Sequence, residues 1–198
     1  WDEKPRTIEP LQSYVTNGFG ACDVQIVTEA VREYQFIGAE YAQIAMTVYR
    51  SVPYLGKSDL QDRPGRESGT KVRTEGTRHM NELIQVRYYL RVLGDVDDEF
   101  SCAQFAKEML TPLIGYQAAS FRNNTDEFVL SIADERNFSP THSLVEVEGE
   151  AICSTIKKDS HGTIVRLYNP KRSDATKASV NDKTVELKTC QFEDLLID

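Results

Sequence analysis

Residues 42–69, AQIAMTVYRSVPYLGKSDLQDRPGRESG, contain the feature from which the rest of the fold is best understood. From Ala42 to Val48 apolar residues occupy every second position, which predicts a strand with one buried face. After Arg50, prolines and glycines interrupt any helix or strand as far as His79. A connection of about 30 residues is several times longer than usual, and loops of that length commonly carry function. We therefore expect a functional loop after this strand.

The loop is basic, although the whole chain has a formal net charge of -8. Between residues 63 and 78 there are five basic side chains and two acidic ones. Guanidinium groups match carboxylates, phosphates and polyhydroxylated ligands through paired hydrogen bonds, which makes Arg63 and Arg66 the substrate-proximal candidates. The alternative is a solvated loop whose arginines contact only water or nearby acids, and composition alone favours this alternative.

The bulk composition describes a globular chain with either one domain or two small ones. It has 198 residues, of which 40% are hydrophobic and 27% charged. No apolar run approaches the ~20 residues of a membrane span, and no charged-then-apolar leader opens the chain. Because the first residue is Trp1, we expect a piece of a longer protein. We expect a cytoplasmic location, no membrane partner and, given the acidic balance, no nucleic-acid partner; a homo-oligomer remains open.

Four cysteines are widely separated in the sequence, at Cys22, Cys102, Cys153 and Cys190. Without a C-x-x-C pair, the spacing argues against a zinc ribbon or a redox motif. We expect these cysteines to be reduced and buried.

Further elements follow the loop. The segment 83–93, LIQVRYYLRVL, predicts a second long strand whose apolar side chains alternate with Gln85, Arg87 and Arg91, and together with the first strand it suggests one large sheet. Residues 97–99 supply helix-start acids, and an apolar stripe from Cys102 to Leu110 predicts a helix that packs on the sheet.

The C-terminal third alternates strand-like runs with turns at residues 148–149, 161–162, 169–170 and 181–182, which suggests a small sandwich. The predicted fold class is therefore mainly β, with a large β-sandwich carrying one helix over residues 1–140 and a smaller β-sandwich over 141–198.

Known catalytic motifs are missing from the sequence. There is no G-x-S-x-G, no G-x-G-x-x-G, no P-loop and no H-E-x-x-H. His79, His142 and His161 are far apart, each in a turn-like stretch, and are interpreted as loop histidines rather than ligands. The acids at 97–99 are interpreted as helix-start residues, and no pair of carboxylates declares itself catalytic.

Three stretches carry a family resemblance: residues 30–69, residues 105–117 (FAKEMLTPLIGYQ) and residues 152–170 (ICSTIKKDSHGTIVRLYNP). In this order they resemble the C-terminal β region of glycoside hydrolase family 38, the retaining α-mannosidases, and the bacterial mannosylglycerate hydrolase branch most of all. The motifs R-P-G-R-x-S-G and R-L-Y-N-P carry the match. Gln35 departs from the acid that the R-E-Y-E pattern of these relatives has at this position.

The resemblance implies a galactose mutarotase-like β-sandwich followed by a smaller one, both packed on an N-terminal catalytic domain of the same chain. It also implies that the zinc ion, its ligands and the nucleophile belong to that other domain, so no catalytic residue, metal ligand or cofactor is expected within residues 1–198.

Two functions follow. In the first, the chain is the non-catalytic, substrate-flanking β region of an α-mannosidase, inactive alone. In the second, it is a free-standing carbohydrate-binding module. Such modules expose aromatic platforms, whereas Trp1 is the only tryptophan here and most tyrosines lie in strand patterns that look buried, which favours the first function.

Overall fold

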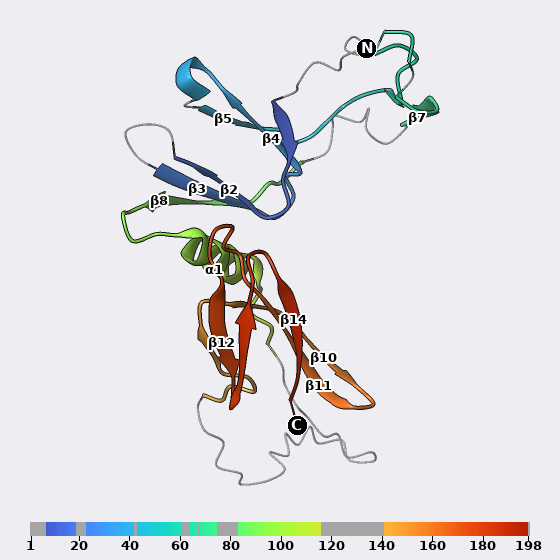
Figure 1. The fold of residues 1–198 in the computed structure, drawn as a ribbon. Coiled ribbons are helices and arrows are strands. Elements are labelled where there is room, and N and C mark those ends of the chain that lie inside the picture. Colours follow the sequence, from blue (N-terminus) through green and yellow to red (C-terminus); the bar gives the residue numbers. More distant parts are fainter. Residues whose placement is uncertain are drawn as a thin grey trace, which may run out of the picture. The chain divides into compact units, whose positions relative to one another are not determined.

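The computed structural model describes residues 7–18, 23–41, 43–60, 64–66, 68–74, 83–115 and 141–197. Its chain divides into two compact units, residues 1–110 and residues 111–198. The described residues are mainly β with one α-helix, as predicted (Figure 1). The predicted boundary at residue 140 falls at the end of the stretch 116–140, which lies outside the described residues, and stays a prediction.

The first unit contains two three-stranded antiparallel sheets. One has the order β1-β4-β5, with bounds Ile8–Pro10, Glu33–Ile37 and Gln43–Met46. The other has the order β2-β3-β8, with bounds Tyr14–Asn17, Asp23–Thr28 and Tyr88–Leu93. A short 3-10 turn, η1 (Ala39–Tyr41), connects β4 to β5.

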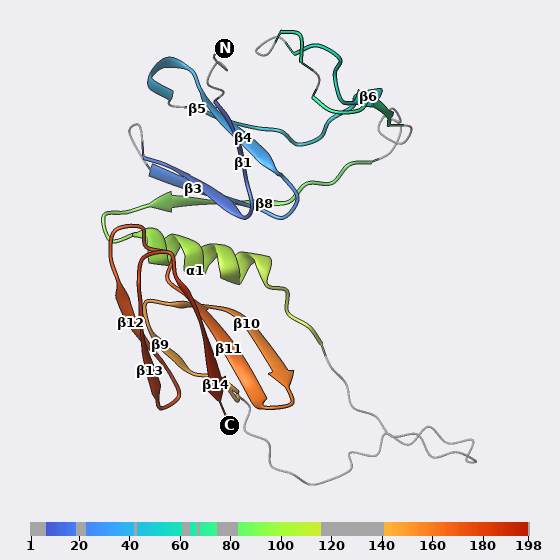
Figure 2. The same ribbon diagram turned by 45° about the vertical axis from the view of Figure 1, so that its right-hand side comes forward.

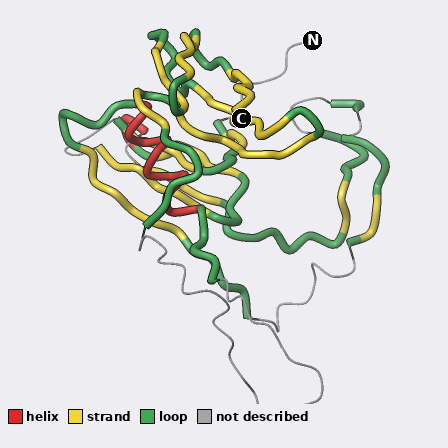
Figure 3. The backbone as a smooth tube through the Cα atoms, turned by 90° about the horizontal axis from the view of Figure 1, so that it is seen from below, coloured by secondary structure: helices red, strands yellow, loops and turns green. Residues whose placement is uncertain are grey.

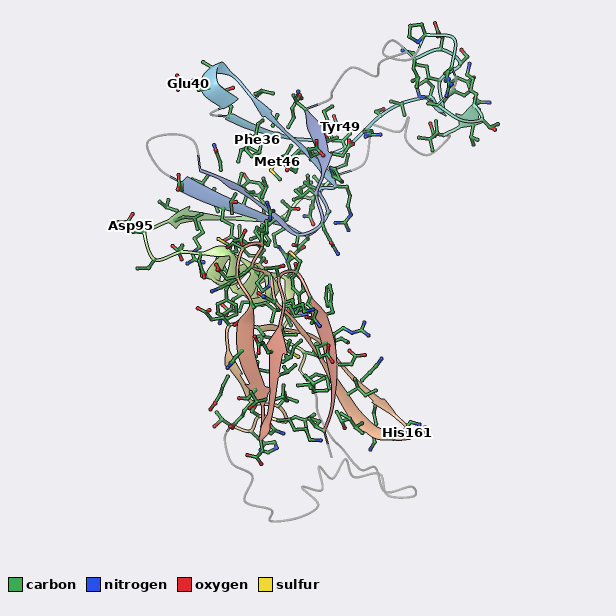
Figure 4. The ribbon with its side chains drawn as sticks, viewed as in Figure 1. Phe36, Glu40, Met46, Tyr49, Asp95 and His161 are labelled. Carbon is green, nitrogen blue, oxygen red and sulfur yellow. The ribbon has the colours of Figure 1, made fainter. Side chains whose placement is uncertain are left out.

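Both sheets contribute to one hydrophobic core. Leu11, Val15 and Val31 form its buried centre. Half-buried side chains pack around them from both sheets and from the approach to β8, namely Ile26, Tyr34, Phe36, Ile44, Met46 and Val86. Figure 4 labels Phe36 and Met46, which lie on neighbouring strands of the β1-β4-β5 sheet.

The predicted strand at the start of the loop is therefore confirmed as β5, with Ile44 and Met46 on its packed face. The expectation that this strand and the next long one share a sheet is wrong, because β5 and β8 lie in different sheets. Side chains of β5 and Val86, which precedes β8, pack on the same buried centre, so the two chain segments meet through the core and not through backbone pairing.

The second predicted strand is shorter than expected, since β8 begins at Tyr88 and residues 83–87 are irregular. Tyr88, Leu90 and Val92 lie on one face, as the alternation predicts. These three residues are nevertheless exposed, at 65%, 64% and 64%. The opposite face carries Arg91, which forms an ion pair with Asp97 and donates to the carbonyl of Ser101 at 3.3 Å.

Helix α1 (Glu99–Leu110) confirms the predicted helix. Asp98 caps it, because its Oδ1 accepts from the Ser101 amide at 2.9 Å while the Ser101 hydroxyl accepts from the Asp98 amide at 3.1 Å. The helix lies along the β2-β3-β8 sheet (Figure 2), where the buried Gln25 side chain donates from Nε2 to the Cys102 carbonyl at 2.7 Å.

The second unit contains two further three-stranded antiparallel sheets. The first has the order β10-β11-β14, with bounds Ile152–Asp159, Gly162–Tyr168 and Phe192–Ile197. The second has the order β13-β12-β9, with bounds Lys183–Leu187, Thr176–Val180 and Val147–Gly149. Fully buried Val165, Leu167, Val180 and Leu187 join the two sheets in one core. The predicted turns at 161–162 and 181–182 are confirmed between paired strands.

Asn169 holds the segment after β11 to the rest of this unit. Its side chain is fully buried, and its Nδ2 donates to the carbonyls of Asp174 at 2.9 Å, Lys188 at 3.0 Å and Leu187 at 3.3 Å. Its Oδ1 accepts from the Lys171 amide at 3.0 Å. One side chain thus satisfies several backbone groups, of which the carbonyls of Asp174 and Lys188 lie outside the strands.

The described cysteines Cys102, Cys153 and Cys190 are free thiols. The expectation of burial holds for Cys102, whereas Cys153 is half-buried and Cys190 is exposed. Among the described residues, no helix has both the length and the apolar character needed to cross a membrane.

Candidate functional site

The predicted functional loop contains a β-hairpin of its own. Strands β6 (Tyr54–Leu55) and β7 (Val72–Arg73) pair antiparallel, with Tyr54 opposite Arg73 and Leu55 opposite Val72. Figure 3 shows them as two short strand segments within a long connection. We call the described residues between 51 and 74 the loop hairpin.

Hydrogen bonds between the two arms hold the loop hairpin along its length. The Thr74 amide donates to the Pro53 carbonyl at 3.0 Å, and the Thr74 hydroxyl donates to the carbonyl of Val52. Farther out, the Ser68 amide donates to the Lys57 carbonyl at 2.9 Å and the Lys57 amide donates to the Ser68 hydroxyl at 2.7 Å. The prolines and glycines of this segment predict a polar loop without strand pairing, whereas in the structure the loop has a paired and defined backbone.

Two glycines serve different purposes in this backbone. Gly56 has φ +79, and a Cβ at this position would lie 2.6 Å from the Thr70 carbonyl oxygen. Gly65 has φ +77 but nothing within 4 Å of such a Cβ, and its amide donates to Asp59 Oδ1 at 2.7 Å. Close approach of the two arms thus requires glycine at position 56, while position 65 requires only the left-handed backbone.

Four cationic side chains gather on the loop hairpin: Lys57, Arg66, Lys71 and Arg73, all on exposed residues. Lys71 lies over the Tyr54 ring, with its Nζ 4.3 Å from the ring centroid. This contact is a cation–π interaction, which orients the ammonium group without neutralising it. Among the described residues of the hairpin, Asp59 is the acidic one, and its carboxylate is used by the Gly65 amide.

Of the two substrate-proximal candidates, the structure places Arg66 in the outer turn of the hairpin, where its carbonyl accepts from the Leu60 amide at 3.2 Å. Arg66 is exposed and takes part in further interactions. Arg63 lies outside the described residues. The hairpin can present guanidinium and ammonium groups to an oxygen-rich ligand, and its backbone bonds would position them.

The two described histidines both belong to the second unit. His161 lies in the turn between β10 and β11 (Figure 4), His142 precedes β9, and His79 lies outside the described residues. Within the described ranges, no three or more His, Cys, Asp or Glu side chains form a group that could hold a metal ion.

A second set of candidate functional residues, not predicted from the sequence, lies on the outer face of the β10-β11-β14 sheet. There Tyr168 stacks on Phe192, and Arg166 pairs with Asp194. In the sequence these four residues alternate with Leu167 and Glu193, which indicates that they share one face of two strands. The sequence does not show which residue of one strand lies opposite which residue of the other, because that register is set only in the folded sheet.

Comparisons of this chain with protein-family models, with curated proteins and with solved structures found no match in any of the three.

Proposed function

We propose that this chain is the non-catalytic β region of a zinc-dependent retaining α-mannosidase, and that it packs against and flanks a catalytic domain of the same protein. The observation that carries the proposal is the row formed by Tyr88, Leu90 and Val92 on β8, which we call the β8 row. Each of these side chains is about two-thirds exposed, at 65%, 64% and 64%.

An aligned apolar row on a sheet-edge strand is unusual on a free surface. Scattered exposed apolar residues are ordinary, whereas contiguous ones mark contact sites or aggregation hazards. Full burial of one such side chain contributes about 1.5–3 kcal/mol. Since three side chains would each bury the exposed two-thirds of their surface, covering the β8 row would contribute roughly 3–6 kcal/mol to the free energy of association. A domain docked on this face would supply that cover.

The loop hairpin supports the flanking role. It is basic, has a defined backbone and connects β5 to β8, the strand that carries the row. A domain that covers the β8 row would therefore have a cationic hairpin joined to the same strand, available for a substrate carboxylate or hydroxyl group.

The proposal is tested with the protein expressed from its complete coding sequence. We expect it to hydrolyse para-nitrophenyl α-mannoside and to hold zinc, and we expect the 198-residue chain alone to do neither. In the complete protein, Leu90→Lys should lower the melting temperature and the activity, whereas Val96→Lys, at a 92% exposed position outside the row, should change neither. A complete protein without mannosidase activity, or equal behaviour of the two variants, would refute the proposal.

A free-standing carbohydrate-binding module is the second candidate, and one observation favours it. The sequence pattern predicts that most tyrosines are buried, but Tyr49, Tyr54 and Tyr88 are exposed, and no tyrosine whose burial the structure describes is fully buried. Exposed aromatic rings are the platforms on which sugar rings pack. Sugar binding by the isolated chain, without any catalytic partner in the complete coding sequence, would favour this second function.

A further inference from the structure

The outer face of the β10-β11-β14 sheet carries an ordered pattern of side chains. Register pairs Tyr168 with Phe192, Arg166 with Asp194 and Ile164 with Leu196. The residues between them, Val165 and Leu167, are fully buried in the core of the unit. Because successive side chains on a strand point to opposite faces, the three pairs lie on the face directed away from that core.

The first pair forms a flat apolar surface. The Tyr168 and Phe192 rings stack with centroids 4.4 Å apart and planes inclined by 20°. Phe192 lies on β14, the edge strand of the sheet, and is 56% exposed. A parallel stack covers one face of the Phe192 ring and leaves the other without an aromatic neighbour from the pair, so a flat ligand can pack there.

The second pair is a fixed set of donors and acceptors. Arg166 donates from Nε to Asp194 Oδ1 at 2.6 Å and from Nη2 to Oδ2 at 2.8 Å, and Lys157 Nζ lies 3.8 Å from the same Oδ2. The Arg166 guanidinium holds the pKa of the Asp194 carboxyl below its usual range, so the carboxylate is ionised at neutral pH. The remaining guanidinium hydrogens can donate while the carboxylate lone pairs accept.

The spacing of the two pairs along the strands suits a sugar ring. Neighbouring residues on one face of a strand are about 6.8 Å apart, so a six-membered sugar ring packed on Phe192 would carry its hydroxyl groups toward the Arg166–Asp194 pair. A pair of adjacent hydroxyl groups can donate to the carboxylate and accept from the guanidinium at once. A phosphate or carboxylate ligand would instead have to compete with Asp194 for Arg166.

We propose that this outer face binds a neutral sugar chain, with one ring packed on Phe192 and the adjacent hydroxyl groups bonded to Arg166 and Asp194. This site goes beyond the proposed function, since it uses only residues of the second unit and needs no catalytic partner.

The test is a titration of the isotope-labelled 198-residue chain with soluble mannan, β-glucan, xylan and galactan, followed by amide chemical shifts. At least one polysaccharide should shift amides of β11 and β14. Phe192→Ala and Asp194→Asn should each weaken that binding by about tenfold or more, whereas Phe192→Tyr should retain it. Leu144→Ala is the matched control, because it removes an exposed apolar side chain that precedes β9.

Negative outcomes of this titration bear on the site and not on the mannosidase activity. Absence of shifts with all four polysaccharides would overturn the proposal, as would binding that Phe192→Ala leaves unchanged while its spectrum remains that of a folded chain. Shifts confined to the first unit would also overturn it. Mannosidase activity of the complete protein would be unaffected by any of these results, so a failure here leaves the proposed function standing.

Discussion

Gly56→Ala is the sharpest available test of the loop hairpin. At φ +79 an alanine carries the left-handed backbone penalty of about 1–2 kcal/mol. In addition its Cβ would lie 2.6 Å from the Thr70 carbonyl oxygen, a backbone atom that cannot rotate away. Separating the arms to relieve this contact should add about 1–3 kcal/mol, the usual cost of overpacking.

Gly65→Ala is the matched control. Its φ of +77 is nearly the same, but the added methyl group would meet nothing within 4 Å. The difference between the two alanine variants therefore isolates the close approach of the arms from the backbone penalty that both share.

Amide hydrogen exchange at Ser68 and Thr74 measures the effect, because these amides donate to carbonyls of the opposite arm. We expect Gly65→Ala to accelerate exchange by about 5- to 30-fold and Gly56→Ala by a further factor of about 5 to 160, unless the hairpin is by then fully open. Equal acceleration in the two variants would show that the arms do not approach as described, and the hairpin would then be a poor platform for ligand-binding side chains.

The remaining predictions concern one functional and two structural contacts. In the complete protein, Arg66→Ala should lower kcat/KM by roughly ten- to hundredfold, the scale of one charged hydrogen bond, while Lys177→Ala at an exposed position of β12 should not. Wild-type kinetics at an unchanged melting temperature would reduce the hairpin to a solvated connection. Asn169→Ala should destabilise the second unit by about 2–4 kcal/mol in chemical denaturation, because the buried Leu187 carbonyl and the part-buried carbonyls of Asp174 and Lys188 lose their donor. A loss below about 1 kcal/mol would contradict the contacts. Hydrogen bonds from the Gly94 amide and Ser101, with Arg91 nearby, lower the pKa of the Asp97 carboxyl in the folded state. The ionised carboxylate therefore stabilises the fold above the unfolded-state pKa of about 3.9, and this stabilisation is lost as the pH falls through the lower folded-state pKa. Asp97→Asn should be less stable than wild type at neutral pH, and the difference should vanish in acid.

Local patterns predicted much of the fold. The alternation before Arg50 gave β5, the acids at 97–99 gave the start of α1, and the turns at 161–162 and 181–182 gave two hairpins of the second unit. Each of these depends on residues within a few positions of one another, so the sequence contains the whole signal.

Long-range partners could not be predicted in the same way. The pattern of residues 83–93 predicts a strand with one apolar face, but not that the side with Arg91 packs on α1 while the apolar side stays exposed. That choice depends on the ion pair with Asp97 and on the helix packed on the β2-β3-β8 sheet. The loop hairpin was missed for a related reason, since its strands are two residues long and too short for any periodicity.

The two exposed surfaces of this chain differ in a way that bears on their partners. The β8 row is apolar at all three of its positions, Tyr88, Leu90 and Val92, so its free energy of association comes from removal of water and should weaken little, if at all, with added salt. The outer face of the second unit alternates a stacked aromatic pair with the Arg166–Asp194 ion pair, so binding there combines packing with hydrogen bonds. A protein domain can cover three apolar positions in succession, whereas a sugar chain presents apolar ring faces and hydroxyl groups side by side. The first surface therefore suits a docked domain and the second a polysaccharide.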